Sequence, residues 1–269
     1  MRFGPAGYPS EGKTPEGSLR YTKEIGLSAL EVEFVRGARI TPERARAIGE
    51  AAKALDIRLS CHAPYFVSFN SEEPETRVKS IGWVMDTVRA AHELGAYIIV
   101  IHAASYGKSP DTALDSVVEG LLKCKEKMDD EGIKDVILGI ETMGKKGQFG
   151  TLKEISKIMD SVGGVRPVLD VAHVHARDGG CLKTKEDMSR LIGEFFPLCG
   201  DIAHFHISGI KYGDKGEISH LPLSSKDPDM QLLADALADS EQDCTFICES
   251  PLIAEDAVVF RDMFPRYRK

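Results

Sequence analysis

The sequence lacks the signatures of several common protein classes. Its six cysteines contain no CxxC pair, so neither a zinc knuckle nor a thioredoxin-type motif is indicated, and we expect buried reduced thiols. The longest apolar runs, such as Tyr97–Ala104, are too short to span a bilayer. The N-terminal segment MRFGPAGYP lacks a basic stretch followed by an apolar one, so no secretory signal is expected. We therefore expect a cytoplasmic protein without a membrane partner.

Glycine-rich nucleotide-binding motifs are also missing. No GxGxxG follows the first predicted strand and no GxxxxGK[ST] occurs, which disfavours nucleotide-binding α/β folds. The chain has no linker, low-complexity tract or shift in composition that would divide it. We therefore predict one domain that spans residues 1–269.

The net charge of −8 argues at first against a polyanionic partner. Many acids fall in predicted helices, however, whereas eight cations follow predicted strands. These are Arg36, Arg39, Lys108, Lys145, Lys146, Arg177, Lys211 and Lys215. Such a rim can contact phosphates, but loop lysines are also often simply solvated, and the charges alone favour the second interpretation.

Short apolar runs alternate with longer amphipathic stretches along the chain. The predicted strands are Arg2–Gly4, Ala29–Val35, Arg58–Cys61, Tyr97–His102, Val136–Glu141, Pro167–Asp170, Ile202–His206 and Thr245–Glu249. Helices are predicted between them, among them Pro74–Leu94 and Asp111–Asp130, and the segment Ser208–Lys226 is predicted to be a long irregular loop. Eight such units in 269 residues predict the α/β class, with a single (β/α)8 TIM barrel.

Polar residues with the chemistry of metal ligands cluster where predicted strands end. They are His62, His102, Glu141, Asp170, His173, His206, Glu217, His220 and Glu249. Strand ends of a parallel barrel meet at one face, where the active sites of such barrels lie. Zinc accepts imidazole nitrogen and carboxylate oxygen, and nine ligands exceed the needs of one catalytic zinc. The sequence therefore predicts a multi-metal site at the C-terminal face, suited to metal-assisted hydrolysis of a phosphoester.

Each of these residues also has a simpler interpretation. A single histidine at a strand end is more often a hydrogen-bonded structural residue, and a glutamate there often caps the next helix. Those interpretations weaken when nine such residues coincide on one face, because unpaired buried charges are costly. His175 and His204 compete with His173 and His206 for the ligand roles and rank second.

Several motifs resemble the endonuclease IV family of apurinic/apyrimidinic endonucleases (AP endonuclease family 2), in an archaeal-looking form. They are CHAPY at Cys61–Tyr65, IETMGKKGQFGT from Ile140, LDVAH at Leu169–His173, HFHISG at His204–Gly209 and CESP at Cys248–Pro251. The order and spacing of these motifs extend the resemblance over nearly the whole chain.

The resemblance implies a zinc-dependent DNA repair enzyme on a (β/α)8 barrel. It would bind three zinc ions, cleave double-stranded DNA 5′ to abasic sites to leave a 3′-hydroxyl, and act as a monomer. By motif, His62, His102 and Glu141 would hold one ion, and Glu141, Asp170, His206 and Glu249 a second. His173 and His220 would hold the third. We expect Glu141 and Glu249 to be essential for catalysis.

Two departures from the family pattern concern the third ion and the support of His206. The family usually has Asp-x-His, whereas Ile218 stands two positions before His220. Glu217, one residue further away, is the expected substitute, and Asp214 is a more remote one. Ser208 and Gly209 replace polar residues that often follow the family's seventh-strand histidine.

Three further residues are candidates for contact with DNA. Tyr65 and Phe66 follow His62 in the loop that enters the duplex in the family, and Arg36 follows the second strand. An exposed aromatic pair can wedge into a stack where a base is missing. The alternative, that both rings pack beneath the loop, is equally compatible with the sequence.

Two competing functions remain open. A sugar isomerase or epimerase on the same barrel type would use one or two metals, with Glu141, Asp170, His206 and Glu249 as ligands, and would leave four histidines without a role. A barrel that only binds DNA or a partner would leave the whole ligand set unexplained, since carboxylates gathered at one rim repel phosphate.

Overall fold

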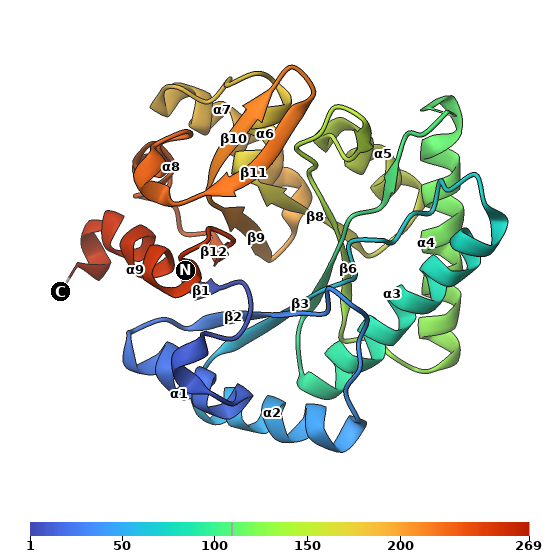
Figure 1. Ribbon diagram of the computed structural model, residues 1–269, viewed down its shortest axis with the longest axis horizontal. Coiled ribbons are helices and arrows are strands. Elements are labelled where there is room, and N and C mark those ends of the chain that lie inside the picture. The colour runs from blue at the N-terminus through green and yellow to red at the C-terminus, as the bar shows by residue number, and fades with distance from the viewer. Residues whose placement is uncertain (109, 269) are drawn as a thin grey trace.

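A computed structural model describes residues 1–108 and 110–268, and within them eight parallel strands form a nearly closed barrel (Figure 1). The strands are β1 (Arg2–Pro5), β2 (Ala29–Glu33), β3 (Arg58–His62), β4 (Ile98–Ile101), β6 (Ile137–Glu141), β8 (Val165–Asp170), β9 (Ile202–Ile207) and β12 (Asp243–Cys248). Their order around the sheet is β1-β12-β9-β8-β6-β4-β3-β2. Beyond the end of β1, Ala6 bridges to Glu31, and Gly7 N donates to Glu31 O at 2.8 Å, which brings the two edge strands together. The predicted barrel is confirmed.

Helices alternate with the strands and surround the sheet (Figure 1). They are α1 (Pro15–Glu24), α2 (Pro42–Ala54), α3 (Pro74–Leu94), α4 (Ala113–Asp130), α5 (Leu152–Ser161), α6 (Val171–Arg177), α7 (Lys185–Cys199), α8 (Met230–Ala236) and α9 (Ile253–Met263). Short 3-10 turns lie at Ser10–Gly12, Pro110–Thr112, Leu223–Ser225 and Pro265–Tyr267. Over residues 1–108 and 110–268, no helix combines the length and apolar character needed to cross a membrane.

Local sequence signals account for several of these boundaries. Thr41 and Thr151 accept hydrogen bonds from the first turns of α2 and α5, and Glu154 completes a capping box with Thr151. All eight predicted strands are present with ends within two residues of those expected, and α3 has the predicted bounds.

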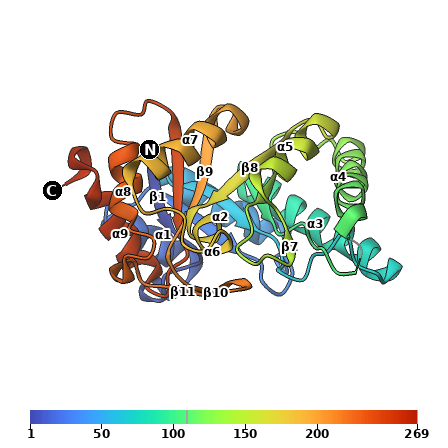
Figure 2. The same cartoon turned by 90° about the horizontal axis from the view of Figure 1, so that it is seen from above.

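Three sequence predictions about local structure are wrong. Ser208–Lys226 is not irregular, because it contains an antiparallel hairpin of β10 (Gly209–Gly213) and β11 (Gly216–Leu221), seen along the lower edge of Figure 2. The two-residue turn between them is followed by Gly216 at φ +90°, a conformation that favours glycine. Helix α6 was not predicted. His173 lies in the first turn of this helix and not at the end of a strand. Glu217 and His220 belong to β11 and not to a barrel strand.

A second antiparallel pair, β5 (Ala104–Ser105) with β7 (Gln148–Phe149), joins the loops that follow β4 and β6. The hairpin β10–β11 contacts the same region, because Lys146 N donates to Lys215 O at 3.1 Å. These loops therefore form one connected layer over the carboxyl ends of the strands.

Apolar side chains fill the space between the sheet and the helices. The ring of Phe246 on β12 stacks on Phe3 of β1, with centroids 5.4 Å apart, and on Phe205 of β9, with centroids 4.8 Å apart. Phe260 of α9 packs against Phe246. The six cysteines are free, and all are buried except Cys181, which is half-buried.

The approach of β1 to β2 can be tested at Gly4. A Cβ added at Gly4 would lie 1.9 Å from Ala29 O, so Gly4→Ala must push the two strands apart. We expect it to lower the free energy of unfolding by at least about 2 kcal/mol in denaturant titrations. Gly82→Ala on the exposed side of α3 is the matched control, since its Cβ would meet nothing within 4 Å. This substitution should raise the free energy of unfolding by up to about 1 kcal/mol. Equal stability of Gly4→Ala and the wild type would contradict this packing.

Candidate metal centre

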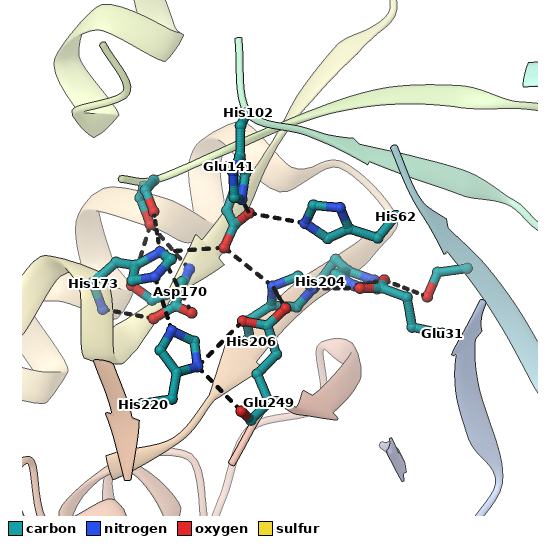
Figure 3. A network of polar contacts seen from close by, with 12 residues as sticks. Glu31, His62, His102, Glu141, Asp170, His173, His204, His206, His220 and Glu249 are labelled. Atoms are coloured by element: carbon teal, nitrogen blue, oxygen red, sulfur yellow. Dashed lines mark hydrogen bonds and ion pairs between the residues drawn. The ribbon is translucent and has the colours of Figure 1, made fainter. Parts of the chain in front are cut away.

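The nine residues predicted as ligands converge at the carboxyl ends of the barrel strands, and Figure 3 labels all of them except Glu217. Four stand at the ends of β3, β6, β8 and β9 or within one residue of them: His62, Glu141, Asp170 and His206. His102 directly follows β4 and Glu249 directly follows β12. His173 comes from α6, and Glu217 and His220 come from the hairpin. The structure thus brings together side chains that lie up to 187 residues apart in the sequence.

The first ligand group consists of His62, His102 and Glu141, whose ligand atoms all lie within 4.8 Å of one another. His102 Nε2 lies 2.6 Å from Glu141 Oε2, and His62 Nε2 lies 3.4 Å from the same oxygen. Glu141 has no solvent exposure, whereas the His102 side chain is 22% exposed at the mouth.

The second group shares Glu141 with the first and adds Asp170, His206 and Glu249. His206 Nδ1 lies 3.2 Å from Glu141 Oε1 and 3.2 Å from Glu249 Oε1. Asp170 Oδ2 is buried without a hydrogen-bond partner among the described residues. A bound cation would satisfy this oxygen, which is otherwise costly to bury.

The third group shares Asp170 with the second and adds His173 and His220. The two Nε2 atoms of these histidines lie 3.1 Å apart, and Glu217 Oε2 lies 3.5 Å from His173 Nε2. Glu217 is therefore close enough to take part in this group, whereas Asp214 is exposed at the turn of the hairpin.

Three histidines are oriented by backbone carbonyls. His62 Nδ1 lies 2.7 Å from Ala63 O, His173 Nδ1 lies 3.0 Å from Thr142 O, and His220 Nδ1 lies 3.1 Å from Glu249 O. Donation of the Nδ1 proton to a carbonyl leaves the Nε2 lone pair directed into the ligand groups. This arrangement is typical of histidines that bind metal ions.

Burial and neighbouring charges oppose each other in this site. Burial alone would lower the pKa of His62, but Glu141 and Glu33 beside it raise that pKa to about 10. Burial likewise opposes protonation of His173, whereas Asp170 and Glu141 raise its pKa to about 10. Without cations, the buried carboxylates therefore hold protons on these two histidines.

The donor set fits divalent cations of the zinc type. Each of the three groups contains both imidazole nitrogens and carboxylate oxygens, and Glu141 and Asp170 each belong to two of these groups (Figure 3). Nearby carboxylates raise the pKa values of His62, His173 and His206, so bound cations would replace the protons that these three histidines otherwise hold.

A cavity of about 370 Å³ opens onto these groups. Tyr65 lines it and is 67% exposed, whereas Phe66 packs on Trp83 with ring centroids 4.4 Å apart. Tyr65 is thus exposed at the cavity, whereas Phe66 is 37% exposed and packs one side of its ring on Trp83. Arg36 is exposed in the turn after β2.

The predicted basic rim is only partly free to contact a ligand. Lys145 is exposed and lines the cavity. Arg177 instead donates to the carbonyls of Met143, Lys145 and Gln148 at 3.3, 2.6 and 2.9 Å, and so it fixes the loop after β6.

Sequence reasoning missed two acids of β2, Glu31 and Glu33, and it gave His204 no role beside Glu31. Glu31 and Glu33 point toward the site, and His204 and His206 both approach Glu31. Burial raises the pKa of Glu33 to about 8, and Glu31 and Glu249 add to the shift. The available signal was two acids at alternate positions of an otherwise apolar strand, ALEVEF.

Comparison with known sequences identifies relatives. A family model described as xylose isomerase-like TIM barrel matches residues 19–262. An uncharacterized protein of Methanocaldococcus jannaschii is 29% identical over 262 residues, 96% of this chain and 94% of that protein. A probable endonuclease 4 of Mycoplasmoides gallisepticum is 28% identical over 146 residues, 52% of this chain and 45% of the relative. The chain thus matches about half the length of that endonuclease relative.

Solved structures show the same fold. A D-tagatose 3-epimerase-like protein has a TM-score of 0.76 at 18% identity, with 99% of this chain and 97% of that chain covered. Endonuclease IV from Thermus thermophilus has a TM-score of 0.72 at 20% identity, with 98% of each chain covered. Both likenesses concern the fold, since both identities are low.

The stability of the metal-free protein should fall as the pH rises. The pKa values of His62 and His173 are raised in the fold to about 10 from 6.5, so their protonation stabilises the fold fully below pH 6.5. That contribution is lost as the pH rises toward 10. We expect a lower melting temperature at about pH 9.5 than at about pH 6.5 in chelator, and a smaller difference with zinc. A metal-free melting temperature that rises over this range would contradict the predicted protonation.

Proposed function

The chain belongs to the family of xylose isomerase-like TIM barrels, and we propose that it is a zinc-dependent endonuclease of DNA repair. It hydrolyses the phosphodiester 5′ to an abasic site in double-stranded DNA and leaves a 3′-hydroxyl. The single observation that supports this proposal best is that three ligand groups are linked through Glu141 and Asp170. The names of the endonuclease 4 relatives agree with it.

Linked groups suit a phosphodiester because its negative charge repels both the nucleophile and the carboxylates of the site. Divalent ions held there would supply a nucleophilic water at neutral pH and neutralise charge on the attacking and leaving oxygens. Glu141 and Asp170 would fix the spacing of neighbouring ions, since each faces two groups. His62, His173 and His220 would keep their ligand nitrogens directed inward through their carbonyl contacts.

The surroundings of the groups support a substrate that enters from a duplex. The cavity is a local hollow, so a deoxyribose phosphate without a base would enter it more readily than an intact base pair. Tyr65 at its edge would fill the gap in the stack, as wedge residues do. Phe66, backed by Trp83, would stiffen that loop, and Arg36 and Lys145 would contact phosphates.

A sugar isomerase or epimerase is the second candidate function. The second group alone, Glu141, Asp170, His206 and Glu249, would supply four ligands to one divalent ion, and epimerases are among the proteins of the same fold. That function would leave His62, His102, His173 and His220 without chemical roles. The number of bound ions therefore separates the two proposals.

The first test combines metal analysis with incubation on DNA. We expect about three zinc ions per chain and cleavage of a duplex with one abasic analogue on its 5′ side. Glu141→Gln should reduce cleavage by at least about 100-fold, because loss of a ligand shared by two groups exceeds the usual effect of a supporting residue. Glu119→Gln, an exposed glutamate on α4, serves as the control with unchanged activity.

Two outcomes would contradict the endonuclease. One manganese or magnesium ion per chain, with turnover of a ketose and no DNA cleavage, would favour the epimerase. Near-normal cleavage by both Glu141→Gln and Glu249→Gln would remove the argument from shared ligands.

The role of Tyr65 can be tested by binding. Tyr65→Ala should weaken binding to abasic duplex by about 10-fold and leave binding to intact duplex almost unchanged, because an aromatic stack on a base contributes about 1–3 kcal/mol. Fluorescence anisotropy with the two duplexes measures both constants. Equal loss on both duplexes would show that the ring acts on the loop and not on the lesion.

A further inference from the structure

We propose that Glu31 is a positioning residue of the metal centre, which fixes the ring of His206 from inside the barrel with the help of His204. This inference rests on the metal-binding part of the proposed function. It concerns residues of this chain that the resemblance to endonuclease IV does not assign.

His206 is oriented differently from the other histidines of the site. Its Nδ1 faces the second ligand group, at 3.2 Å from both Glu141 and Glu249. Its Nε2 faces the barrel interior and lies 3.0 Å from Glu31 Oε1. A carboxylate thus occupies the place that a backbone carbonyl takes behind His62, His173 and His220. A carboxylate behind a ligand histidine fixes the ring and makes it a stronger donor.

Glu31 is itself held in place by side chains. Ser60 Oγ donates to Glu31 Oε2 at 2.6 Å, and His204 Nε2 lies 3.2 Å from the same oxygen. All three residues are at most 1% exposed. Because β2 and β9 are not neighbours in the sheet, the contacts from Glu31 to His204 and His206 cross the interior of the barrel (Figure 3).

The polar contacts continue away from the site toward the amino ends of the strands. His204 Nδ1 lies 2.5 Å from Tyr97 Oη, and the guanidinium of Arg58 lies over the Tyr97 ring, 5.7 Å from its centroid. Arg58 in turn pairs with Asp243 at 2.6 Å and donates to Thr245 at 3.0 Å. A polar column therefore extends from His206 to the cavity of about 470 Å³ that Arg58 and Tyr97 line at the other end.

Such a column is unusual for the interior of a barrel, which is generally filled by layers of branched apolar side chains. Buried polar groups cost stability relative to apolar packing even when they are paired. The column ends on the Nε2 atom of His206 and thereby determines that Nδ1 faces the second group. This role gives a reason for polar groups at a place where apolar packing would be more stable.

The test compares zinc binding by Glu31→Gln and the wild type. Glutamine keeps the size of the side chain but removes the negative charge behind His206. We expect the affinity for one of the bound zinc ions, measured by competition with a chelator, to fall about 10–100-fold in Glu31→Gln. The affinities for the other ions should not change. The visible absorption of the cobalt-substituted protein should change as well, since it reports the ligand geometry.

Thr87→Val is the matched control for lost stability. Thr87 is a buried residue of α3 whose hydroxyl donates to Trp83 O at 2.9 Å, outside the column. It should lower the melting temperature without a change in zinc affinity or cobalt spectrum. If Glu31→Gln behaves in the same way, Glu31 is only structural and the inference is overturned.

A milder variant covers the case in which Glu31→Gln does not fold. Tyr97→Phe removes only the hydroxyl beside His204, and it should weaken the same ion by roughly 3-fold. Wild-type affinity and spectrum in a folded Tyr97→Phe protein would then overturn the inference. If the wild type binds no zinc, both the proposed function and this inference are overturned. If the wild type binds zinc and Glu31→Gln has the same zinc affinity and cobalt spectrum, only this inference is overturned.

Discussion

The buried carboxylate of Glu141 is the contact on which the arrangement of the whole site depends. Its two oxygens lie within 3.4 Å of nitrogens from His62 of β3, His102 just after β4, His173 of α6 and His206 of β9. A fully buried anion requires positive charge nearby. Either protons on His62, His173 and His206 or divalent cations supply it, so protonation and metal binding compete for the same atoms.

The barrel makes this contact possible because it brings the ends of eight strands to one face. Asp170 has two roles at this face. It ends β8, its side chain caps α6 through His173 N at 2.6 Å, and it faces two ligand groups. The turn from strand to helix at Asp170 thereby places His173 in the third group, beside His220 of the hairpin.

The strands and most candidate ligands could be predicted from the sequence because both are local signals. A short apolar run that ends in His, Glu or Asp predicts a strand and its functional end together, as at His62 and Glu141. The hairpin β10–β11 was missed because its strands are short and polar, so Glu217 and His220 had no apolar run to mark them. Glu31 was missed because its partners His204 and His206 lie across the barrel, and the two acids of ALEVEF do not by themselves indicate which side chains they face.

The most direct measurement is anomalous diffraction from crystals of the zinc-loaded protein, recorded at the zinc absorption edge. The account predicts three separate peaks, one within each group built on His62, on His206 and on His173, with Glu141 and Asp170 each between two of them. A single peak at Glu141, Asp170, His206 and Glu249, or peaks only on the protein surface, would contradict it.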